Sequence, residues 1–437
     1  MFVILQTKFV VAHKKYQRMM TIQRKRYLDK LIAGQGNGLV KIVTGGRRCG
    51  KSFLLFNLFH NYLIEKGIPG NHIIEVSLDD RRSKPLRNPD ALLDYIDNHI
   101  SKDGSSYYVI LDEVQLVDNF VEVLLSLMHN PQLDVYVSGS NSKFLSKDVV
   151  TEFRGRGDEV RVWPLSFSEY FDAIGGDKQT AWREYYTFGG LPQVALMDSK
   201  EKKIDYLQNI YELTYFRDII ERHHLRNEEG LRQVVQILAS GIGTSTNPKR
   251  ISNTFQSVEN VSISHNTVKD YIGYMQDSFM VEEALRYNVK GRKYIGAETK
   301  YYFSDMGLRG AILSFRQQEE NHIMENVIYN ELRMRGFQVD VGLVETWGTN
   351  ANGQNIRRNL EIDFVANKGY YRYYIQSAFN MDDDDKKKQE EASLRAIKDA
   401  FKRVIVVKDD IMPYYNDNGF LIIGLFDFLL NPNSLDQ

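Results

Sequence analysis

Eight residues near the N-terminus have the types and spacing of a phosphate-binding loop. Residues 45–52 read Gly-Gly-Arg-Arg-Cys-Gly-Lys-Ser and fit the pattern G-x-x-x-x-G-K-[ST]. The glycines allow the backbone to wrap a polyphosphate, so that successive N–H groups face the anion. Lys51 is expected to neutralise the β and γ phosphates, and Ser52 to hold Mg²⁺. The predicted nucleotide contacts are Gly45, Gly46, Arg47, Arg48, Cys49, Gly50, Lys51, Ser52 and Phe53.

A hydrophobic run that ends in two acids follows further along the chain. Residues 107–113 read Tyr-Tyr-Val-Ile-Leu-Asp-Glu, which is a Walker B pattern. Asp112 is expected to bind Mg²⁺, and Glu113 to orient and deprotonate the attacking water, because phosphoryl transfer needs positioning and charge neutralisation. A strand that simply ends in a polar turn is the alternative, but the upstream loop makes the pairing specific. The expected cofactors are therefore ATP and Mg²⁺.

Polar residues after the next strand complete the candidate site. Residues 135–138 lead into Gly-Ser-Asn-Ser, so Ser140 or Asn141 is the candidate sensor of the γ-phosphate. Arg154 and Arg156 are candidates for a γ-phosphate contact, from their own chain or from a neighbouring subunit. An ordinary surface position explains these arginines equally well, because an arginine's role depends on geometry.

The elements around these motifs predict an α/β fold, a doubly wound parallel sheet of the P-loop NTPase type. Short apolar runs alternate with amphipathic stretches from about residue 39 to residue 162. The phosphate loop falls between a predicted strand and a predicted helix, as phosphate binding requires. The predicted strands are 39–44, 73–78, 107–111 and 135–138, and the predicted helices are 51–66, 89–100 and 121–128.

The second half of the chain first changes to helical periodicity and then returns to strands. Residues 248–255 and 265–279 read as a helix-turn-helix, and residues 284–289 and 300–303 as the hairpin of a winged helix. A second α/β domain follows, and the charged run 382–388 is expected to be a solvated loop. The predicted divisions are a flexible basic leader (1–20), an ATPase domain (21–200), a helical and winged-helix region (201–315) and a C-terminal α/β domain (316–437).

The winged-helix candidate offers a route to DNA. Asn266 and Lys269 lie on the exposed side of the second helix, where they could read bases. Asp270 and Asp277 lie on the same helix and would repel the DNA backbone. An intramolecular lid or a docking surface for a protein partner are the alternatives. The residues expected to contact phosphates are Arg286, Lys290, Arg292 and Lys293.

On these motifs the chain resembles the AAA-type P-loop ATPases of a bacterial and archaeal family, in which a domain of unknown function follows the ATPase domain. The resemblance extends from about residue 20 almost to the C-terminus and implies ATP binding and hydrolysis. Because members of the family usually begin near residues 19–21, residues 1–18 are expected to be a leader or an over-extended start. The matching stretches are 41–52, 109–115, 138–145, 163–167, 250–258, 286–295, 301–308, 322–336 and 360–376.

The last domain resembles the restriction-endonuclease-like nucleases at the level of fold. That pattern places an acid on the first helix, an aspartate at a strand end and E-x-K on the next strand. Glu325 and Asp363 take the first two places, but the third reads Gln376-Ser377-Ala378, without a lysine. Because nuclease chemistry needs a group that activates water or stabilises the transition state, an inactive, structural or binding version is favoured.

Composition restricts the classes of protein that remain. The chain has 437 residues, 43% of them hydrophobic and 26% charged, which is typical of a globular protein with several domains. Its single cysteine, Cys49, and the absence of a signal peptide predict a cytoplasmic protein, and no apolar run reaches the roughly 20 residues that span a membrane. Oxidation of Cys49 would hinder phosphate binding, although a small variable residue is the simpler interpretation.

The net charge of −1 combines a basic start with an acidic remainder. Residues 1–30 contain eight basic residues and one acid. A net-acidic body is not typical of a protein that coats nucleic acid, although a local basic patch remains compatible with it.

These observations favour an ATP-binding and ATP-hydrolysing AAA-type switch that couples nucleotide state to its C-terminal half. A DNA-binding regulatory or defence protein, in which ATP only sets the conformation, is the alternative, and a metal-dependent nuclease is favoured less. The expected partners are ATP or ADP, DNA through the winged helix and a protein partner, while the sequence does not indicate an oligomeric state.

Overall fold

The computed structural model consists of two compact units. It describes residues 22–101, 104–139, 155–258, 263–349, 355–381 and 383–436. Unit 1 extends to residue 165 and also contains residues 169–175 and 191–196, whereas unit 2 contains residues 166–168, 176–190 and 197–437. The chain therefore passes between the units several times between residues 165 and 197.

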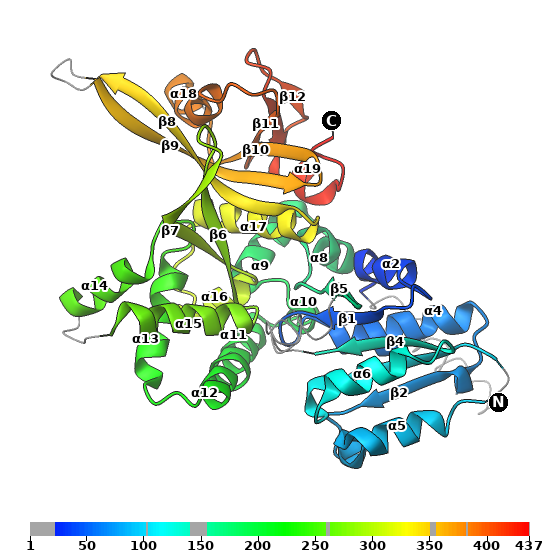
Figure 1. Cartoon of the computed structure of the whole chain (residues 1–437). Coiled ribbons are helices and arrows are strands. Elements are labelled where there is room, and N and C mark those ends of the chain that lie inside the picture. The colour runs from blue at the N-terminus through cyan, green and yellow to red at the C-terminus, as the bar shows by residue number, and fades with distance from the viewer. Residues whose placement is uncertain are drawn as a thin grey trace, which may run out of the picture. The chain divides into compact units, whose positions relative to one another are not determined.

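Unit 1 is a five-stranded parallel sheet with helices on both faces (Figure 1). Its strands are β1 (Val40–Thr44), β2 (Ile73–Ser77), β3 (Tyr107–Asp112), β4 (Leu133–Ser138) and β5 (Gly157–Arg161), in the order β2-β3-β4-β1-β5. Successive strand residues alternate between two apolar cores, because each strand is covered on both faces. This is the predicted sheet of a P-loop NTPase.

The helices of unit 1 divide between the two faces. On one face lie α5 (Pro89–Asp97) and α6 (Phe120–Met128). On the other lie α2 (Lys25–Ala33) and one continuous helix made of α3 (Lys51–Phe53), the π-type turns η1 (Leu54–Phe59) and α4 (His60–Glu65). The predicted cap of α5 is confirmed, since the Asn88 side chain accepts a hydrogen bond from the Ala91 N–H at 3.0 Å. Short 3₁₀ turns η2 (Gly70–His72), η3 (Arg81–Arg87) and η4 (Val114–Leu116) also belong to this unit.

Helices also fill the first part of unit 2, as the sequence predicted. The predicted helix pair is present as α14 (Pro248–Val258) and α15 (His265–Asp277). Within the described parts of the chain, no helix combines the length and apolar character needed to cross a membrane. The other helices of this first part of unit 2 are α9 (Lys178–Phe188), α11 (Lys200–Ile210), η6 (Tyr211–Phe216), α12 (Arg217–His223), α13 (Glu228–Ser240) and α16 (Met306–Ile312). Most of α8 (Phe167–Ile174) and all of α10 (Pro192–Ala195) belong to unit 1.

An eight-stranded mixed sheet forms the rest of unit 2. The strand order is β12-β13-β11-β10-β9-β8-β6-β7, and α17 (Glu320–Met334), α18 (Asp384–Arg395) and α19 (Leu425–Leu430) accompany it (Figure 1). The strands are β6 (Val281–Asn288), β7 (Lys293–Phe303), β8 (Gln338–Thr349), β9 (Asn355–Lys368), β10 (Tyr371–Ala378), β11 (Lys402–Val407), β12 (Tyr414–Tyr415) and β13 (Leu421–Gly424).

The predicted hairpin of the winged helix is present as β6 and β7, but it is not a separate wing. Strand β6 pairs in parallel with β8 from Arg286↔Val341 to Asn288↔Leu343. The hairpin therefore belongs to the C-terminal sheet, and the boundary predicted at residue 315 falls inside unit 2. This pairing joins strands that are far apart in the sequence, so a local pattern could not reveal it.

The charged run predicted as a loop instead begins a helix. Helix α18 starts at Asp384, and the Asp383 carboxylate accepts a hydrogen bond from the Lys386 N–H at 2.7 Å. Acids in the first turn followed by lysines are favourable there, because carboxylates stabilise a helix N-terminus. Asp382 lies outside the described residues.

Candidate nucleotide site and a buried charged cluster

The phosphate loop joins β1 to the helix that begins at Lys51. Gly45 and Gly50 have φ of 137° and 97°, which favour glycine, and a Cβ at Gly45 would lie 2.0 Å from the carbonyl oxygen of Val162. The Lys51 ammonium donates to the carbonyl oxygens of Gly45 and Gly46, each at 3.0 Å. Lys51 is only 5% exposed, so its charge is held directly at the loop.

The predicted metal ligands come together at the carboxyl ends of the strands. The Asp112 carboxylate at the end of β3 accepts hydrogen bonds from the hydroxyls of Ser138, at the end of β4, and Ser52, at the start of the helix. Burial raises the pKa of Asp112, while the two hydroxyls oppose this shift. Asp112 and Ser52 are thus adjacent oxygen donors, the type that Mg²⁺ prefers.

Glu113 is held next to Asp112 in an uncommon backbone conformation. Its φ is 55°, in the left-handed region that is costly for a residue other than glycine. The Glu113 N–H donates to the Ser138 hydroxyl at 3.4 Å, and the Glu113 carboxylate accepts a hydrogen bond from the Gln115 side chain. These contacts place a half-buried carboxylate beside the predicted metal ligand.

A buried arginine that the motifs did not predict supports the phosphate loop. Arg24, which precedes α2, is 4% exposed and donates to the carbonyl oxygens of Cys49 at 3.0 Å and Trp163 at 2.6 Å. It also forms an ion pair with Glu169 at 3.2 Å. The Cys49 thiol packs in the core, as expected of a small variable residue. The sequence analysis did not predict a role for either Arg24 or Ser138. Arg24 is one of eight basic residues in the first 30, and Ser138 was predicted only as the last residue of a strand.

Of the predicted sensor and arginine residues, only Arg156 lies within the residues that the structure describes. Ser140, Asn141 and Arg154 lie outside the described residues. Arg156 is exposed and precedes β5, which pairs with β1 from Val40↔Gly157 onward. Because the phosphate loop follows the other end of β1, five residues away, Arg156 lies about 15 Å along the sheet from the loop. This position does not favour a γ-phosphate contact by Arg156 in its own chain. A contact from a neighbouring subunit stays a prediction.

Unit 2 contains a buried cluster of charges at the nuclease-like positions. The Lys300 ammonium of β7 lies 2.9 Å from the Glu325 carboxylate, 2.8 Å from Glu361 and 3.7 Å from Asp363. The Tyr302 hydroxyl donates to Glu325 at 2.7 Å. The structure thus joins the predicted pair Glu325 and Asp363 through a lysine from another strand.

The surroundings of this cluster set the protonation of its members. Burial and the nearby charge of Glu325 raise the pKa of Asp363 to about 8. Burial alone would lower the pKa of Lys300. The nearby Glu325, Asp363 and Glu361 outweigh this effect and raise the pKa. No group of three or more metal-ligating side chains with suitable geometry occurs in the described parts of the chain. The residues present therefore fit an internal ammonium better than a metal ion.

Of the other residues predicted to be functional in unit 2, some are bonded to neighbouring side chains and the rest are exposed. The Gln376 side chain donates to Glu390 on α18 at 3.1 Å instead of joining the charged cluster. Arg286 is engaged by Glu298 at 3.0 Å and Glu361 at 2.9 Å, so its predicted phosphate contact is not supported. The exposed candidates are Asn266, Lys269, Lys290, Arg292 and Lys293.

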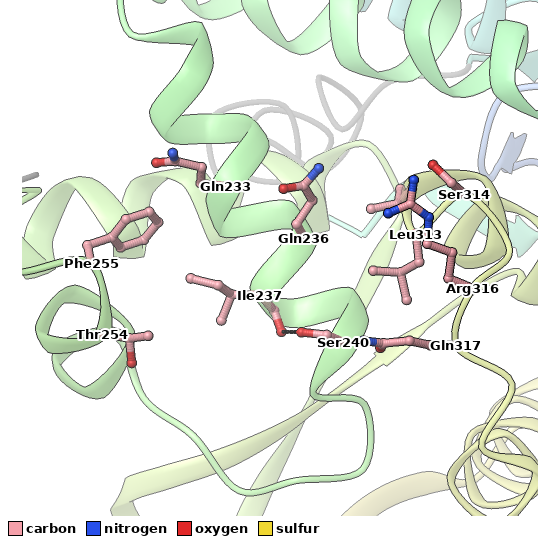
Figure 2. A pocket seen from close by; sticks show the side chains of 11 residues that line it. Gln233, Gln236, Ile237, Ser240, Thr254, Phe255, Leu313, Ser314, Arg316 and Gln317 are labelled. Atoms are coloured by element: carbon pink, nitrogen blue, oxygen red, sulfur yellow. Dashed lines mark hydrogen bonds between the residues drawn. The ribbon is translucent and has the colours of Figure 1, made fainter. Parts of the chain in front are cut away.

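Two cavities of about 500 Å³ occur in unit 2, and no residue of the phosphate loop lines either one. The first lies among α13, α14 and the segment after α16 (Figure 2), where Ser240 Oγ donates to the carbonyl oxygen of Ile237 at 3.0 Å. Glutamines and serines share its lining with apolar side chains. The second is lined by Asn247, Arg286, Ile295, Glu298, Leu343, Glu345, Arg357 and Asn359.

The family comparison agrees with the geometry of unit 1. Residues 37–171 match the model of a family described as an AAA domain. This part of the chain is an AAA-type P-loop domain. Residues 179–319 match a family described only as a domain of unknown function.

Two relatives match this chain over nearly its whole length. An uncharacterized protein of Haemophilus influenzae is 28% identical over 94% of this chain and 98% of the relative. Another, of Methanocaldococcus jannaschii, is 26% identical over 89% of this chain and 85% of the relative. Among solved structures, Cdc6p from Pyrobaculum aerophilum covers 70% of this chain and 94% of its own, at 12% identity and a TM-score of 0.29. That superposition is too loose to support a functional argument.

Proposed function

We propose that this AAA protein binds ATP with Mg²⁺ and hydrolyses it to switch the state of its C-terminal unit. The observation that carries the proposal is the phosphate loop with Lys51 buried against it and the Ser52–Asp112 pair beside it. Loop N–H groups and a lysine fit a polyphosphate, and two adjacent oxygen donors fit its metal ion.

Each residue of the site has a proposed task. Lys51 exchanges its bonds to loop carbonyls for bonds to the β and γ phosphates. Ser52 and Asp112 hold Mg²⁺, which supplies charge neutralisation when bound. Glu113 orients the attacking water and accepts its proton, and Gln115 positions the Glu113 carboxylate. Ser140 or Asn141 is proposed to sense the γ-phosphate, and Arg156 to act only from a neighbouring subunit.

A segment that belongs to both units supports the proposed coupling. In unit 2, the Gly190 N–H donates to the Asp305 carboxylate at 2.7 Å. The next residues, 191–196, belong to unit 1, where Pro192 lies 3.7 Å from the Cβ position of Gly50 in the phosphate loop. A rearrangement of the loop on nucleotide binding would therefore reach Asp305 through a few covalently linked residues.

Paired substitutions test the proposal. Lys51→Ala should abolish the shift in melting temperature that Mg·ATP produces in the wild type, because the bound phosphates lose their main counter-charge. Glu113→Gln should keep that shift but lower phosphate release at least about 100-fold, since a general base contributes roughly 10²- to 10⁴-fold. Lys66→Ala, an exposed change at the end of the same helix, is the matched control. A wild-type protein that is not stabilised by Mg·ATP or Mg·ADP would refute the proposal.

A further inference from the structure

Two strand ends of unit 2 form a projecting surface that differs in composition from the rest of the chain. In the described residues, β8 pairs with β6 only as far as Leu343, and beyond that point β8 and β9 continue as a two-stranded hairpin (Figure 1). The turn between β6 and β7 lies at the base of this hairpin, because the Lys290 ammonium donates to the Glu345 carbonyl oxygen at 2.6 Å. We call residues 290–294, 344–349 and 355–359 together the basic arm.

The charge of the basic arm is strongly positive. It contains one acid, Glu345, which is already engaged by Arg357 and by the Asn288 side chain at 3.0 Å. The whole chain has a net charge of −1, so five basic residues against one acid form a local concentration of positive charge. Its basic residues are Lys290, Arg292, Lys293, Arg357 and Arg358.

Exposed aromatic rings lie among these charges. Trp347 is 76% exposed, although the other two tryptophans, Trp163 and Trp182, are only 5% and 1% exposed. Trp347 is the cross-strand partner of Arg357, so a flat ring and a guanidinium are neighbours on the hairpin. Tyr294, the second residue of β7, is 53% exposed.

We propose that the basic arm binds single-stranded nucleic acid, with a base stacked on Trp347 and phosphates bound by Arg292 and Lys293. Cationic side chains interleaved with exposed aromatic rings are the combination that binds single strands without sequence preference. A single strand is favoured over a duplex because the base faces of a duplex are already stacked on each other. The proposal concerns unit 2 alone and does not depend on ATP binding.

The full-length protein tests the proposal directly. A labelled single strand of about 16 thymidines should bind at low salt, near 50 mM, more tightly than a duplex of equal length. Binding should quench tryptophan fluorescence, since Trp347 is the only exposed tryptophan among the three. Trp347→Ala should weaken binding about tenfold or more, because stacking on an aromatic ring contributes about 1–3 kcal/mol per base. Tyr370→Ala removes another exposed aromatic ring, 83% exposed in the β9–β10 turn, and should leave the affinity unchanged.

Salt dependence separates the phosphate contacts from the stacking. The double change Arg292→Ala and Lys293→Ala should reduce the slope of log affinity against log salt by about 1.4, the value for two lost single-strand phosphate contacts. The control pair Lys387→Ala and Lys388→Ala, exposed on α18, should leave the slope unchanged. Because all these side chains are exposed, each variant should keep the wild-type circular dichroism and melting temperature.

Several results would overturn the proposal. The proposal is wrong if neither nucleic acid binds at low salt or if single strand and duplex bind with equal affinity. It is also wrong if Trp347→Ala binds the single strand as tightly as the wild type does. Complete displacement of the strand by an equal charge of polyglutamate would also overturn it, because the arm would then bind anions in general. Quenching of Trp347 by anionic phospholipid vesicles without any quenching by the oligonucleotide would assign the surface to a membrane instead.

Discussion

The lysine that the nuclease-like pattern lacks on β10 is present on β7. Lys300 lies within 3.0 Å of both Glu325 and Glu361 and 3.7 Å from Asp363. The sequence predicted Glu325 and Asp363 as a pair, because both occupy recognisable places on a helix and a strand. It could not predict Lys300, which precedes Glu325 by 25 residues and approaches it only through the sheet. An ammonium among three carboxylates argues for a structural cluster instead of a metal-dependent nuclease.

The raised pKa of Asp363 predicts a pH-dependent stability. Because its folded-state pKa is about 8, above the ordinary value of 3.8, the folded protein keeps a proton that the unfolded chain loses. The wild type should therefore lose stability as pH rises from about 4 to about 8. Asp363→Asn, which is neutral at every pH, should remove this part of the dependence, so that the melting-temperature difference between variant and wild type grows in favour of the variant as pH rises. Asp417→Asn, an exposed change, should follow the wild type, and parallel curves for Asp363→Asn and the wild type would contradict the assignment.

At the scale of elements, the local sequence pattern predicted individual strands and helices, but it did not predict how distant strands pair. The four predicted strands and three predicted helices of unit 1 lie within a few residues of their predicted ranges, because strands buried on both faces give continuous apolar runs between helix caps. Strand β5 had no predicted range. The pairing of β6 with β8 was not predicted, since it joins strands separated by α16 and α17. Helix α2 was also missed as a part of the site, and it follows the arginine that supports the phosphate loop.

That arginine predicts an effect of α2 on nucleotide binding. Arg24→Met should lower the free energy of unfolding by about 3–5 kcal/mol, because it leaves the Glu169 carboxylate without its buried partner. It should also weaken nucleotide affinity, since the Cys49 carbonyl of the loop loses its donor. Lys25→Met changes the next residue, whose ion pair with Asp29 is exposed, and should cost at most about 0.5 kcal/mol.

Denaturant unfolding and titration with a fluorescent ATP analogue measure both effects of Arg24. The double variant Arg24→Met with Glu169→Gln should be more stable than Arg24→Met alone, because it also removes the buried charge that has lost its arginine. An Arg24→Met protein that binds the analogue with wild-type affinity would show that the loop holds its shape without this support.

At the scale of the molecule, the helical region and the C-terminal sheet belong to one compact unit. The hairpin of β6 and β7 supplies both an edge of the eight-stranded sheet and the lysine that lies among Glu325, Glu361 and Asp363. The sequence divided this unit at residue 315, because the pattern there changes from helices to strands and gives no sign of the parallel pairing.

Fragments of the chain test this unity. Residues 316–437 expressed alone should lack a cooperative thermal transition by circular dichroism, since they expose the edge of β8 and leave Glu325 and Glu361 without the Lys300 ammonium. Residues 166–437, which include all of unit 2, should unfold cooperatively and remain monodisperse on gel filtration. A cooperative transition of the shorter fragment would show that the boundary at residue 315 separates two domains after all.

The repeated passage of the chain between the units also limits where recombination between genes could exchange one unit without disrupting the other. Short segments of the two units alternate between residues 165 and 197. A single recombination junction inside this stretch would therefore cut a segment off from the unit to which it belongs. Exchange of the C-terminal half with an unrelated gene would therefore tend to disrupt both units. This agrees with relatives that align over 94% and 89% of the chain, and it predicts that the two units diverge together as one heritable piece.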